Sequence, residues 1–323
     1  MDIVLDHVTK VFPTYEKSPG LLGGIFRRKK REKLAINDLN LTIPSGSLIA
    51  VLGPNGSGKT TLMKMLSGIL VPTAGTIKIG HFTPAKREKK FLQKISLVMG
   101  QKSQLWWDLP PMDSFLFLSS IYEVPKKKFQ KQLQELADLL NINGLLYTPT
   151  RKLSLGERMR CELVAALLHE PGILFLDEPT IGLDIVSQQK IRQFIQEYHQ
   201  QKKATILLTS HNMEDIESIC KKIIIVNQGT IVFEGTVENF KKTHPVDAII
   251  HFTLQHPQSL PSAVKKYTHK NHSDLVVTIT VPYNDLGFVT SELLSKLKLH
   301  SFTIKEPSFD AVISKFFIKT THS

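Results

Sequence analysis

The chain has 323 residues and a formal net charge of +12, from 41 lysines and arginines against 29 aspartates and glutamates. Hydrophobic residues make up 41% of the sequence, which excludes wholesale disorder. Only two cysteines are present, Cys161 and Cys220, too few for a disulfide framework or a multi-cysteine metal site. No run approaches the roughly 18 apolar residues of a transmembrane helix, and the start, MDIVLDHVTK, is not a secretory signal. We therefore expect a reduced, cytosolic protein with an anionic partner.

Short apolar runs alternate with helical patterns up to about residue 240. We expect buried strands at 48–52, 95–99, 173–176 and 205–208, and helices at 59–67, 129–140, 157–168 and 186–200. This alternation predicts an α/β domain with a parallel or mixed sheet. Further strands at 3–5 and 39–43, and a hairpin of strands 223–226 and 231–234, predict antiparallel elements beside that core.

The pattern changes after about residue 242 and carries no chemical motif. Strands are expected at 246–254, 275–281 and 301–305, with helices near 262–268, 284–297 and 308–317. We therefore divide the chain into a first domain at 1–240 and a small α+β domain at 241–323.

An insertion at about residues 13–33 interrupts the first domain. Its apolar stretch at 21–26 is followed by six basic residues between Arg27 and Lys33. Such a segment is typical of a solvated, charged loop, and it also fits contact with an anionic membrane face or a membrane subunit. Both interpretations remain open.

A glycine-rich segment follows the expected strand at 48–52 and precedes a helix. It matches G-x-x-x-x-G-K-[ST], the loop whose backbone amides hold phosphate groups. Lys59 would reach the β- and γ-phosphates, and the Thr60 hydroxyl would bind Mg²⁺. The motif residues are Gly53, Pro54, Asn55, Gly56, Ser57, Gly58, Lys59 and Thr60, and we add Thr61 to the nucleotide-binding set.

Two acidic residues end the apolar run at 173–176. A buried strand delivers carboxylates to its carboxyl end, where ligands bind in open α/β sheets. Asp177 would hold Mg²⁺, and Glu178 would act as general base toward an attacking water.

Between these motifs lies Leu153-Ser154-Leu155-Gly156-Glu157-Arg158, just before a helix. It resembles the LSGGQ signature of ATP-binding-cassette (ABC) ATPases, with Leu155 in place of a glycine and Glu157 in place of the glutamine. The order of the motifs, over about residues 1–240, is also similar to that family. The resemblance implies a P-loop cassette with a RecA-like mixed sheet, an antiparallel β subdomain and a helical signature subdomain at about 102–165.

The resemblance also implies roles for individual residues. Gln101 resembles the glutamine that senses Mg²⁺ and the attacking water, and His211 resembles the histidine that contacts the γ-phosphate. Ser154 and Gly156, together with Glu157, would contact ATP held by a second subunit, so the resemblance implies a dimer closed around two ATP molecules. Asp184 resembles a residue of the loop along the dimer seam, and it would equally cap the helix that follows.

The adenine ring is expected to stack on an aromatic residue near the N-terminus. Phe12 best matches the position that this resemblance implies. Tyr15 is the alternative, because the insertion that follows obscures the alignment.

Both tryptophans of the chain, Trp106 and Trp107, lie five and six residues after Gln101. This region resembles the ATPase subunits of ABC-2-type exporters, as does the segment at 306–312, and it implies docking of a separate ABC-2-type permease at the inner face of the membrane. A homodimer is expected, and the permease would select the substrate. The alternative is a non-transport ABC ATPase acting on ribosomes or DNA. The resemblance disfavours nucleic acid, because DNA-repair members of the family carry a long coiled coil or zinc motifs between phosphate loop and signature. The stretch from Gly53 to Gly156 has neither sustained heptads nor a cysteine cluster.

Overall fold

The computed structural model describes residues 1–16, 29–100, 102–305 and 307–321. The chain forms two compact units, Met1–Thr236 and Val237–Ser323. The expected boundary at residue 240 falls inside helix α9 (Val237–Thr243) of the second unit. Phe240 on this helix is fully buried, and the rings of Phe309 and Phe316 pack against it. This packing explains why the helix belongs to the second unit.

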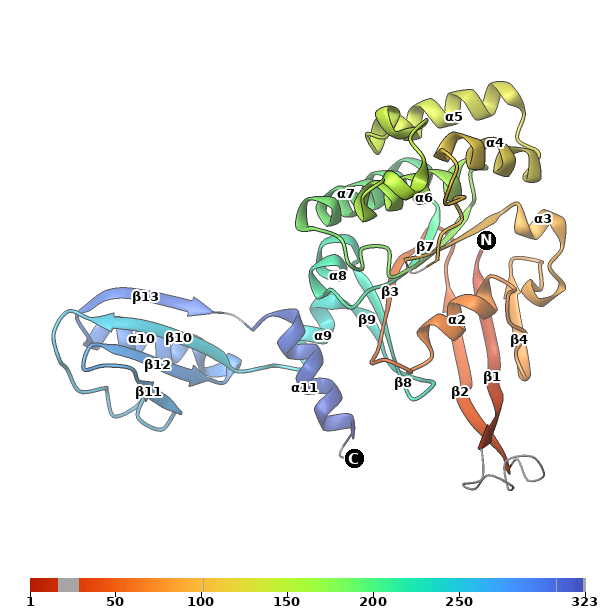
Figure 1. Cartoon of the computed structure of the whole chain (residues 1–323). Coiled ribbons are helices and arrows are strands. Elements are labelled where there is room, and N and C mark those ends of the chain that lie inside the picture. Colours follow the sequence, from red (N-terminus) through yellow and green to blue (C-terminus); the bar gives the residue numbers. More distant parts are fainter. Residues whose placement is uncertain (17–28, 101, 306, 322–323) are drawn as a thin grey trace, which may run out of the picture. The chain divides into compact units, whose positions relative to one another are not determined.

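A six-stranded sheet forms the centre of the first unit (Figure 1). Its order is β5-β6-β7-β3-β8-β9, and every neighbouring pair is parallel except β8 and β9. The strands with apolar runs are buried along most of their length, as expected for a sheet covered on both faces. The strands are β3 (Leu48–Leu52), β5 (Ile95–Met99), β6 (Ile173–Asp177), β7 (Thr205–Thr209), β8 (Lys222–Asn227) and β9 (Thr230–Thr236).

A second, antiparallel sheet has the order β2-β1-β4. It contains β1 (Ile3–Glu16), β2 (Lys29–Ile43) and β4 (Ala74–Ile79). The first residues of the insertion expected at about 13–33 therefore belong to the end of β1, and its last residues belong to the start of β2. Its residues 17–28, which include Arg27 and Arg28, lie outside the described residues.

The region at about 102–165, where the signature subdomain is expected, contains the α-helices α4 (Pro111–Ile121) and α5 (Lys126–Leu139) and most of α6 (Leu155–Leu167). Figure 1 shows α4 and α5 together at one end of the unit. Helix α4 was not predicted from the sequence, because its apolar residues give no clear helical stripe, and Leu116, Phe117 and Ile121 among them are exposed. The other helical segments are α2 (Lys59–Leu66), α3 (Lys89–Leu92), α7 (Ile185–Lys202), α8 (Met213–Ile219), and the short η1 (Pro84–Lys86), η2 (Asn143–Leu145) and η3 (Thr150–Lys152).

The second unit is an antiparallel sheet with the order β11-β12-β10-β13. Val289 and Leu293 of α10 belong to the hydrophobic core that this sheet builds. The unit is an α+β fold, as expected. Its elements are β10 (Ala248–Leu254), β11 (His269–Asn271), β12 (Val276–Val281), β13 (Leu299–Lys305), η4 (Tyr283–Asp285), α10 (Leu286–Lys296) and α11 (Phe309–Thr321).

The prediction of a helix near residues 262–268 is wrong. The structure has successive turns there, in which Val264 and Lys265 both donate backbone hydrogen bonds to the Pro261 carbonyl. The chain enters β11 at His269, so too few residues remain to extend a nucleus into a helix. Within the described ranges, no helix combines the length and the apolar character needed to cross a bilayer.

Candidate active site

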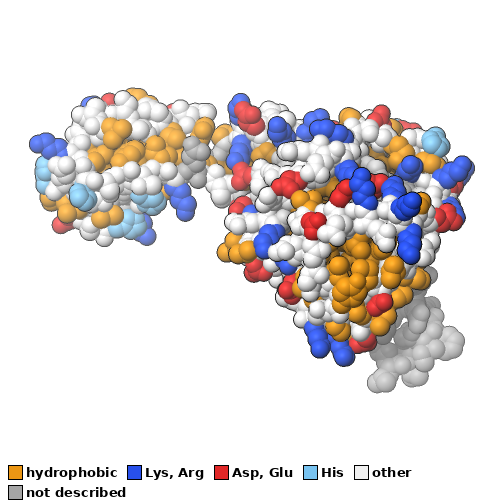
Figure 2. All heavy atoms as spheres, turned by 90° about the horizontal axis from the view of Figure 1, so that it is seen from above, with side chains coloured by type: hydrophobic (Ala, Val, Ile, Leu, Met, Phe, Trp, Pro, Cys, Tyr) orange, Lys and Arg blue, Asp and Glu red, His pale blue; other side chains and the backbone are white. Residues whose placement is uncertain are grey.

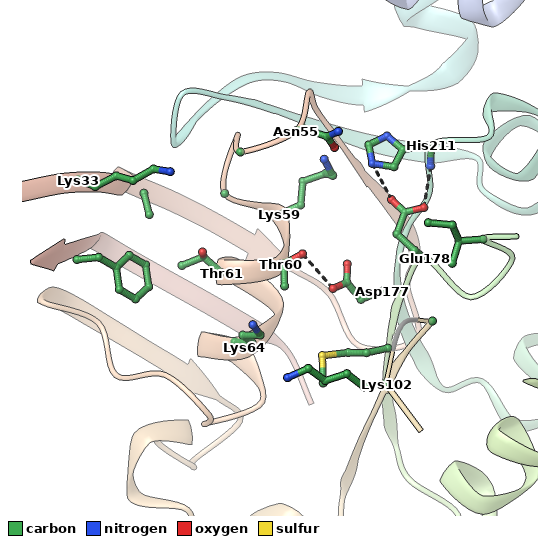
Figure 3. A pocket seen from close by; sticks show the side chains of 17 residues that line it. Lys33, Asn55, Lys59, Thr60, Thr61, Lys64, Lys102, Asp177, Glu178 and His211 are labelled. Atoms are coloured by element: carbon green, nitrogen blue, oxygen red, sulfur yellow. Dashed lines mark hydrogen bonds and ion pairs between the residues drawn. The ribbon is translucent and has the colours of Figure 1, made fainter. Parts of the chain in front are cut away.

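A cavity of about 450 Å³ opens at the carboxyl edge of the central sheet (Figure 3). It brings together residues that the sequence analysis selected from four separate segments. Gly53, Pro54 and Ser57 belong to the same phosphate loop, although they do not line the cavity. Gln101 lies outside the described residues. The selected lining residues are Phe12, Asn55, Gly56, Gly58, Lys59, Thr60, Thr61, Asp177, Glu178 and His211.

The phosphate loop, residues 53–60, requires glycine at two close approaches. A Cβ atom on Gly53 would lie 2.2 Å from the Val226 carbonyl oxygen, and one on Gly58 would lie 2.6 Å from the Ala35 carbonyl oxygen. Both residues also have positive φ angles, 156° and 112°. The loop ends at the start of α2, whose free amides attract anions.

Lys59 is held inside this loop. Its Nζ donates hydrogen bonds to the carbonyl oxygens of Gly53, at 2.6 Å, and Pro54, at 3.1 Å. Burial lowers the pKa of Lys59, although the nearby carboxylates of Glu178 and Asp177 oppose this effect. The ammonium group is thus positioned where the loop would receive phosphate oxygens.

Asp177 joins the phosphate loop to the neighbouring strand end. Its Oδ2 accepts a hydrogen bond from the Thr60 hydroxyl at 3.0 Å, and its Oδ1 accepts one from the Thr209 hydroxyl at 2.6 Å. A hydroxyl beside a carboxylate is the oxygen-rich ligand set that Mg²⁺ prefers. The residues present therefore fit a magnesium ion at Thr60 and Asp177.

Glu178 turns sharply away from the strand, with a left-handed φ of 57°. Its Oε2 accepts a hydrogen bond from the His211 amide at 3.1 Å, and its Oε1 lies 3.3 Å from His211 Nε2. That second contact is within ion-pair distance but is not a hydrogen bond, so Oε1 is buried without a hydrogen-bond partner. Burial raises the pKa of Glu178, and the charges of His211 and Lys59 oppose this effect. The side chain fits the environment of a general base.

The hairpin of β1 and β2 contributes the wall that carries Phe12. Phe12 pairs with Lys33 across the two strands, and both line the cavity. Lys10 Nζ lies 5.2 Å from the centre of the Phe12 ring. The side chain of Tyr15, the alternative adenine-stacking residue, lies outside the described residues.

Three lysines of the cavity wall were missed by the sequence analysis: Lys33, Lys64 and Lys102. Lys33 was counted with the basic insertion, but the strand register places it at the cavity instead. Lys33 pairs with Phe12 across the hairpin, and this position could have been found only from the strand register, which the sequence alone does not give. Lys64 was recoverable in principle, because it lies one helical turn after Thr60 on α2.

The signature residues do not line the cavity. Ser154 caps α6: its hydroxyl accepts a hydrogen bond from the Glu157 amide at 3.3 Å, and the Glu157 carboxylate accepts one from the Ser154 amide at 2.9 Å. These reciprocal bonds form a capping box. Gly156 is buried, and a Cβ atom there would lie 2.3 Å from the Ser187 hydroxyl. Packing against α7 therefore accounts for the glycine in this subunit. Asp184 caps α7 as expected, accepting from the Ser187 amide at 2.9 Å.

The fold and the cavity together define a P-loop nucleotide-binding ATPase. The family model described as ABC transporter matches residues 36–181. The ABC transporter ATP-binding protein NatA of Bacillus subtilis is 30% identical over 214 residues, which cover 66% of this chain and 87% of that protein. The chain belongs to the ABC ATPase family.

Other comparisons extend this finding. The linearmycin resistance ATP-binding protein LnrL of Bacillus subtilis is 26% identical over 290 residues, covering 86% of this chain and 92% of LnrL. The energy-coupling factor transporter ATP-binding protein EcfA2 of Bacillus cereus is 32% identical over 214 residues, covering 64% and 73%. An ATP-binding cassette solved as a dimer with ADP and Pi, MJ0796, has a TM-score of 0.61 at 23% identity, covering 72% of this chain and 98% of that one. This last likeness shows the fold.

Replacing Lys59 with alanine should abolish high-affinity ATP binding, because the ammonium group inside the phosphate loop would be lost. Lys64→Ala is the matched control, since Lys64 also lines the cavity but lies outside the loop. Titration of both purified variants with a fluorescent ATP analogue would measure the difference. Wild-type affinity in Lys59→Ala would contradict the assignment.

Replacing Glu178 with glutamine should slow ATP hydrolysis by about 10²–10⁴-fold, the usual contribution of a general base. It should also raise the unfolding temperature of the nucleotide-free protein at neutral pH. Because burial raises the pKa of Glu178 in the folded state, the ionised carboxylate destabilises the fold above that pKa, and protonation removes the penalty as the pH falls.

The gain in unfolding temperature from Glu178→Gln should therefore shrink toward acidic pH. Thermal unfolding of wild type and variant across acidic and neutral buffers would measure this trend. The exposed Glu135, replaced by glutamine in the same way, is the control that should show no such trend. A gain that grows toward acidic pH would contradict the burial argument.

Proposed function

We propose that this chain is the ATP-hydrolysing subunit of an ABC-2-type exporter, which dimerises around ATP and drives a separate membrane permease. The observation that carries the proposal is the single cavity that unites the phosphate loop, the Asp177–Glu178 pair and His211 (Figure 3). Family membership supports ATP as the nucleotide and a permease as the kind of partner.

The residues of the cavity divide the hydrolytic work. Thr60 and Asp177, together with Gln101, would hold a magnesium ion, which would neutralise charge on the β- and γ-phosphates. Lys59 and the loop amides would bind the same phosphates. Glu178 would accept a proton from the attacking water, because its buried Oε1 has no hydrogen-bond partner. His211 would face the γ-phosphate while its amide fixes the Glu178 carboxylate at 3.1 Å.

A second copy of the chain would complete the site. Ser154, Gly156 and Glu157 stand at the amino end of α6, which provides an anion-binding helix terminus without lining this subunit's own cavity. In a head-to-tail pair, that terminus would contact the γ-phosphate of ATP held by the partner subunit. ATP would then favour the closed pair, because only the closed state makes this contact.

An exposed hydrophobic surface offers a docking site for the permease. Trp106 and Trp107 have exposed fractions of 41% and 54%, and Leu116, Phe117 and Ile121 of α4 are also exposed. Figure 2, seen from the side of α4 and α5, shows hydrophobic side chains gathered on this unit with charged side chains around them. Exposed aromatic residues of this kind are typical anchors of protein interfaces.

One comparison favours export and a membrane location. The match with LnrL, whose name refers to linearmycin resistance, covers 86% of this chain, whereas the matches with NatA and EcfA2 cover 66% and 64%. The subunit would then lie at the inner face of the cell membrane, held there by the permease. Lys33 lines the cavity, so we assign it to the nucleotide site. For the other basic residues of 27–33, contact with the membrane face stays a proposal.

Dimerisation can be tested with Glu178→Gln, which should retain bound ATP. We expect this variant to elute from size-exclusion chromatography as a dimer with ATP and Mg²⁺ and as a monomer with ADP. Adding Ser154→Arg should abolish the dimer, because a bulky side chain would block the signature end of α6, while ATP binding persists. A monomer with ATP in Glu178→Gln itself would contradict dimerisation of the isolated subunit.

Docking can be tested by affinity purification of the tagged chain from detergent-solubilised cells of its native host. We expect a polytopic membrane protein to co-purify with the wild type and to be lost from the double variant Trp106→Ala/Trp107→Ala, which removes both exposed rings. Mass spectrometry of the two eluates would identify the partner. Recovery of ribosomes or DNA in place of a membrane protein would contradict the transport proposal and favour a non-transport ABC ATPase.

A further inference from the structure

The segment between β5 and α4 carries both tryptophans of the chain. We call residues 102–109 the tryptophan loop. Trp106 and Trp107 are exposed, but the backbone on either side of them is fixed by hydrogen bonds. The partners of those bonds show which part of the cassette moves with the loop.

A single buried carboxylate holds the first half of the tryptophan loop. Glu162 of α6 has an exposed fraction of 3%. Its Oε1 accepts hydrogen bonds from the Ser103 hydroxyl and from the Gln104 amide at 3.0 Å, with the Leu105 amide at 3.4 Å. Its Oε2 also accepts from the Gln104 amide, at 2.9 Å. One side chain thus binds three consecutive residues of the loop.

Burying a carboxylate is unfavourable unless strong hydrogen bonds compensate for the lost hydration. Burial raises the pKa of Glu162, while the bonds from Ser103, Gln104 and Leu105 oppose this effect. The following positions on α6, Leu163 and Val164, are buried and apolar, so an apolar residue would fit the pattern of this helix at Glu162. The acid is explained by the donors of the loop, since charged acceptors bind amides more strongly than neutral ones.

The second half of the tryptophan loop is bonded to the segment that leads into the signature. The Arg151 amide donates to the Trp107 carbonyl at 2.9 Å, and the Thr150 amide donates to the Leu109 carbonyl at 3.0 Å. The guanidinium of Arg158 on α6 lies 5.5 Å from the centre of the Trp107 ring. Both halves of the loop are therefore attached to α6 or to the residues just before it.

We propose that Glu162 is a positioning residue that couples the tryptophan loop to the signature end of α6. Ser154 and Glu162 lie about two turns, or roughly 12 Å, apart on the same helix, which transmits displacement as a rod. Movement of the loop would move Ser154 and Gly156 relative to ATP in a partner subunit, and closure over ATP would move the loop in return. The docking of a permease on the loop rests on the proposed function, whereas the coupling itself needs only this chain.

The two tryptophans allow the coupling to be measured directly, because all intrinsic tryptophan fluorescence of the chain comes from this loop. In the Glu178→Gln background, addition of ATP and Mg²⁺ should shift the tryptophan emission and reduce its quenching by acrylamide. With Glu162→Ala added, both responses should be lost and quenching without nucleotide should increase. ATP affinity, measured with a fluorescent analogue, should stay unchanged.

Three further variants separate positioning from general destabilisation. Glu162→Gln keeps an acceptor oxygen at the same side-chain length, so it should restore part of the response. Ser103→Ala removes one donor from the loop side and should weaken the response in the same direction. Leu163→Ala creates a cavity at the neighbouring buried position of α6 but removes no polar contact, so its fluorescence response should remain that of the parent.

The proposal would be overturned if Glu162→Ala kept both responses of the parent, the emission shift and the reduced quenching. It would also be overturned if Leu163→Ala lost both responses to the same extent as Glu162→Ala. A parent protein that binds ATP and dimerises without any change in emission would also overturn it, while leaving the proposed ATPase function intact. Failure of the parent to bind ATP at all would instead contradict the proposed function.

Discussion

The register between neighbouring parallel strands determines where the whole site lies. Asp177, the last residue of β6, pairs with Met99 at the end of β5 and with Thr209 at the end of β7. Thr209 in turn pairs with Val51 of β3. These pairs form one row across the sheet, so the segments that leave each strand emerge at the same edge. Gln101, Glu178, His211 and the phosphate loop all follow that row within a few residues.

Motifs that follow buried strands were therefore predictable from sequence. The phosphate loop and the Asp177–Glu178 pair each come directly after an apolar run, and the parallel pairing of those runs brings them together. Phe12 and Lys33 were harder, because their proximity depends on the register of a long hairpin across an insertion. The close approach of Gly156 to the Ser187 side chain on α7 is a second reason for the glycine, and only the structure reveals it. Side chains that pack between helices leave no local pattern.

Glu162 illustrates a second limit of the sequence. An acid in a helix that also carries Glu157, Arg158 and Arg160 looks like an exposed position. Only the structure shows that Glu162 is buried beneath the tryptophan loop. The turns at 261–268 show the opposite error, because a short stretch with helical spacing cannot overcome the cost of helix nucleation. In both cases the deciding information lies in residues distant along the chain or in the length left between strands.

Glu178 departs from local rules in two ways. Glu178 has a positive φ of 57°, a conformation that costs energy for a residue with a side chain. Its Oε1 and the Ser57 hydroxyl are both buried without hydrogen-bond partners, and both belong to the segments around the cavity. Buried polar atoms without partners are rare in folded proteins, and two of the five found among the described residues belong to these segments. At Glu178, a strained backbone and a buried oxygen without a hydrogen-bond partner thus coincide with a residue that a motif selects.

In the capping box, Glu157 binds the same Ser154 hydroxyl that the proposed dimer would use to contact phosphate. The Ser154 hydroxyl donates to Glu157 Oε2 at 2.9 Å, so its one hydrogen atom is already in use. The hydrogen bonds from the Ser154 amide and hydroxyl lower the pKa of Glu157, which keeps its carboxylate charged and the cap strong. For the hydroxyl to donate to a phosphate of a partner's ATP, that bond has to break. Glu157 therefore stabilises the free state of α6, and in the proposed dimer ATP would have to supply the difference when the two subunits close.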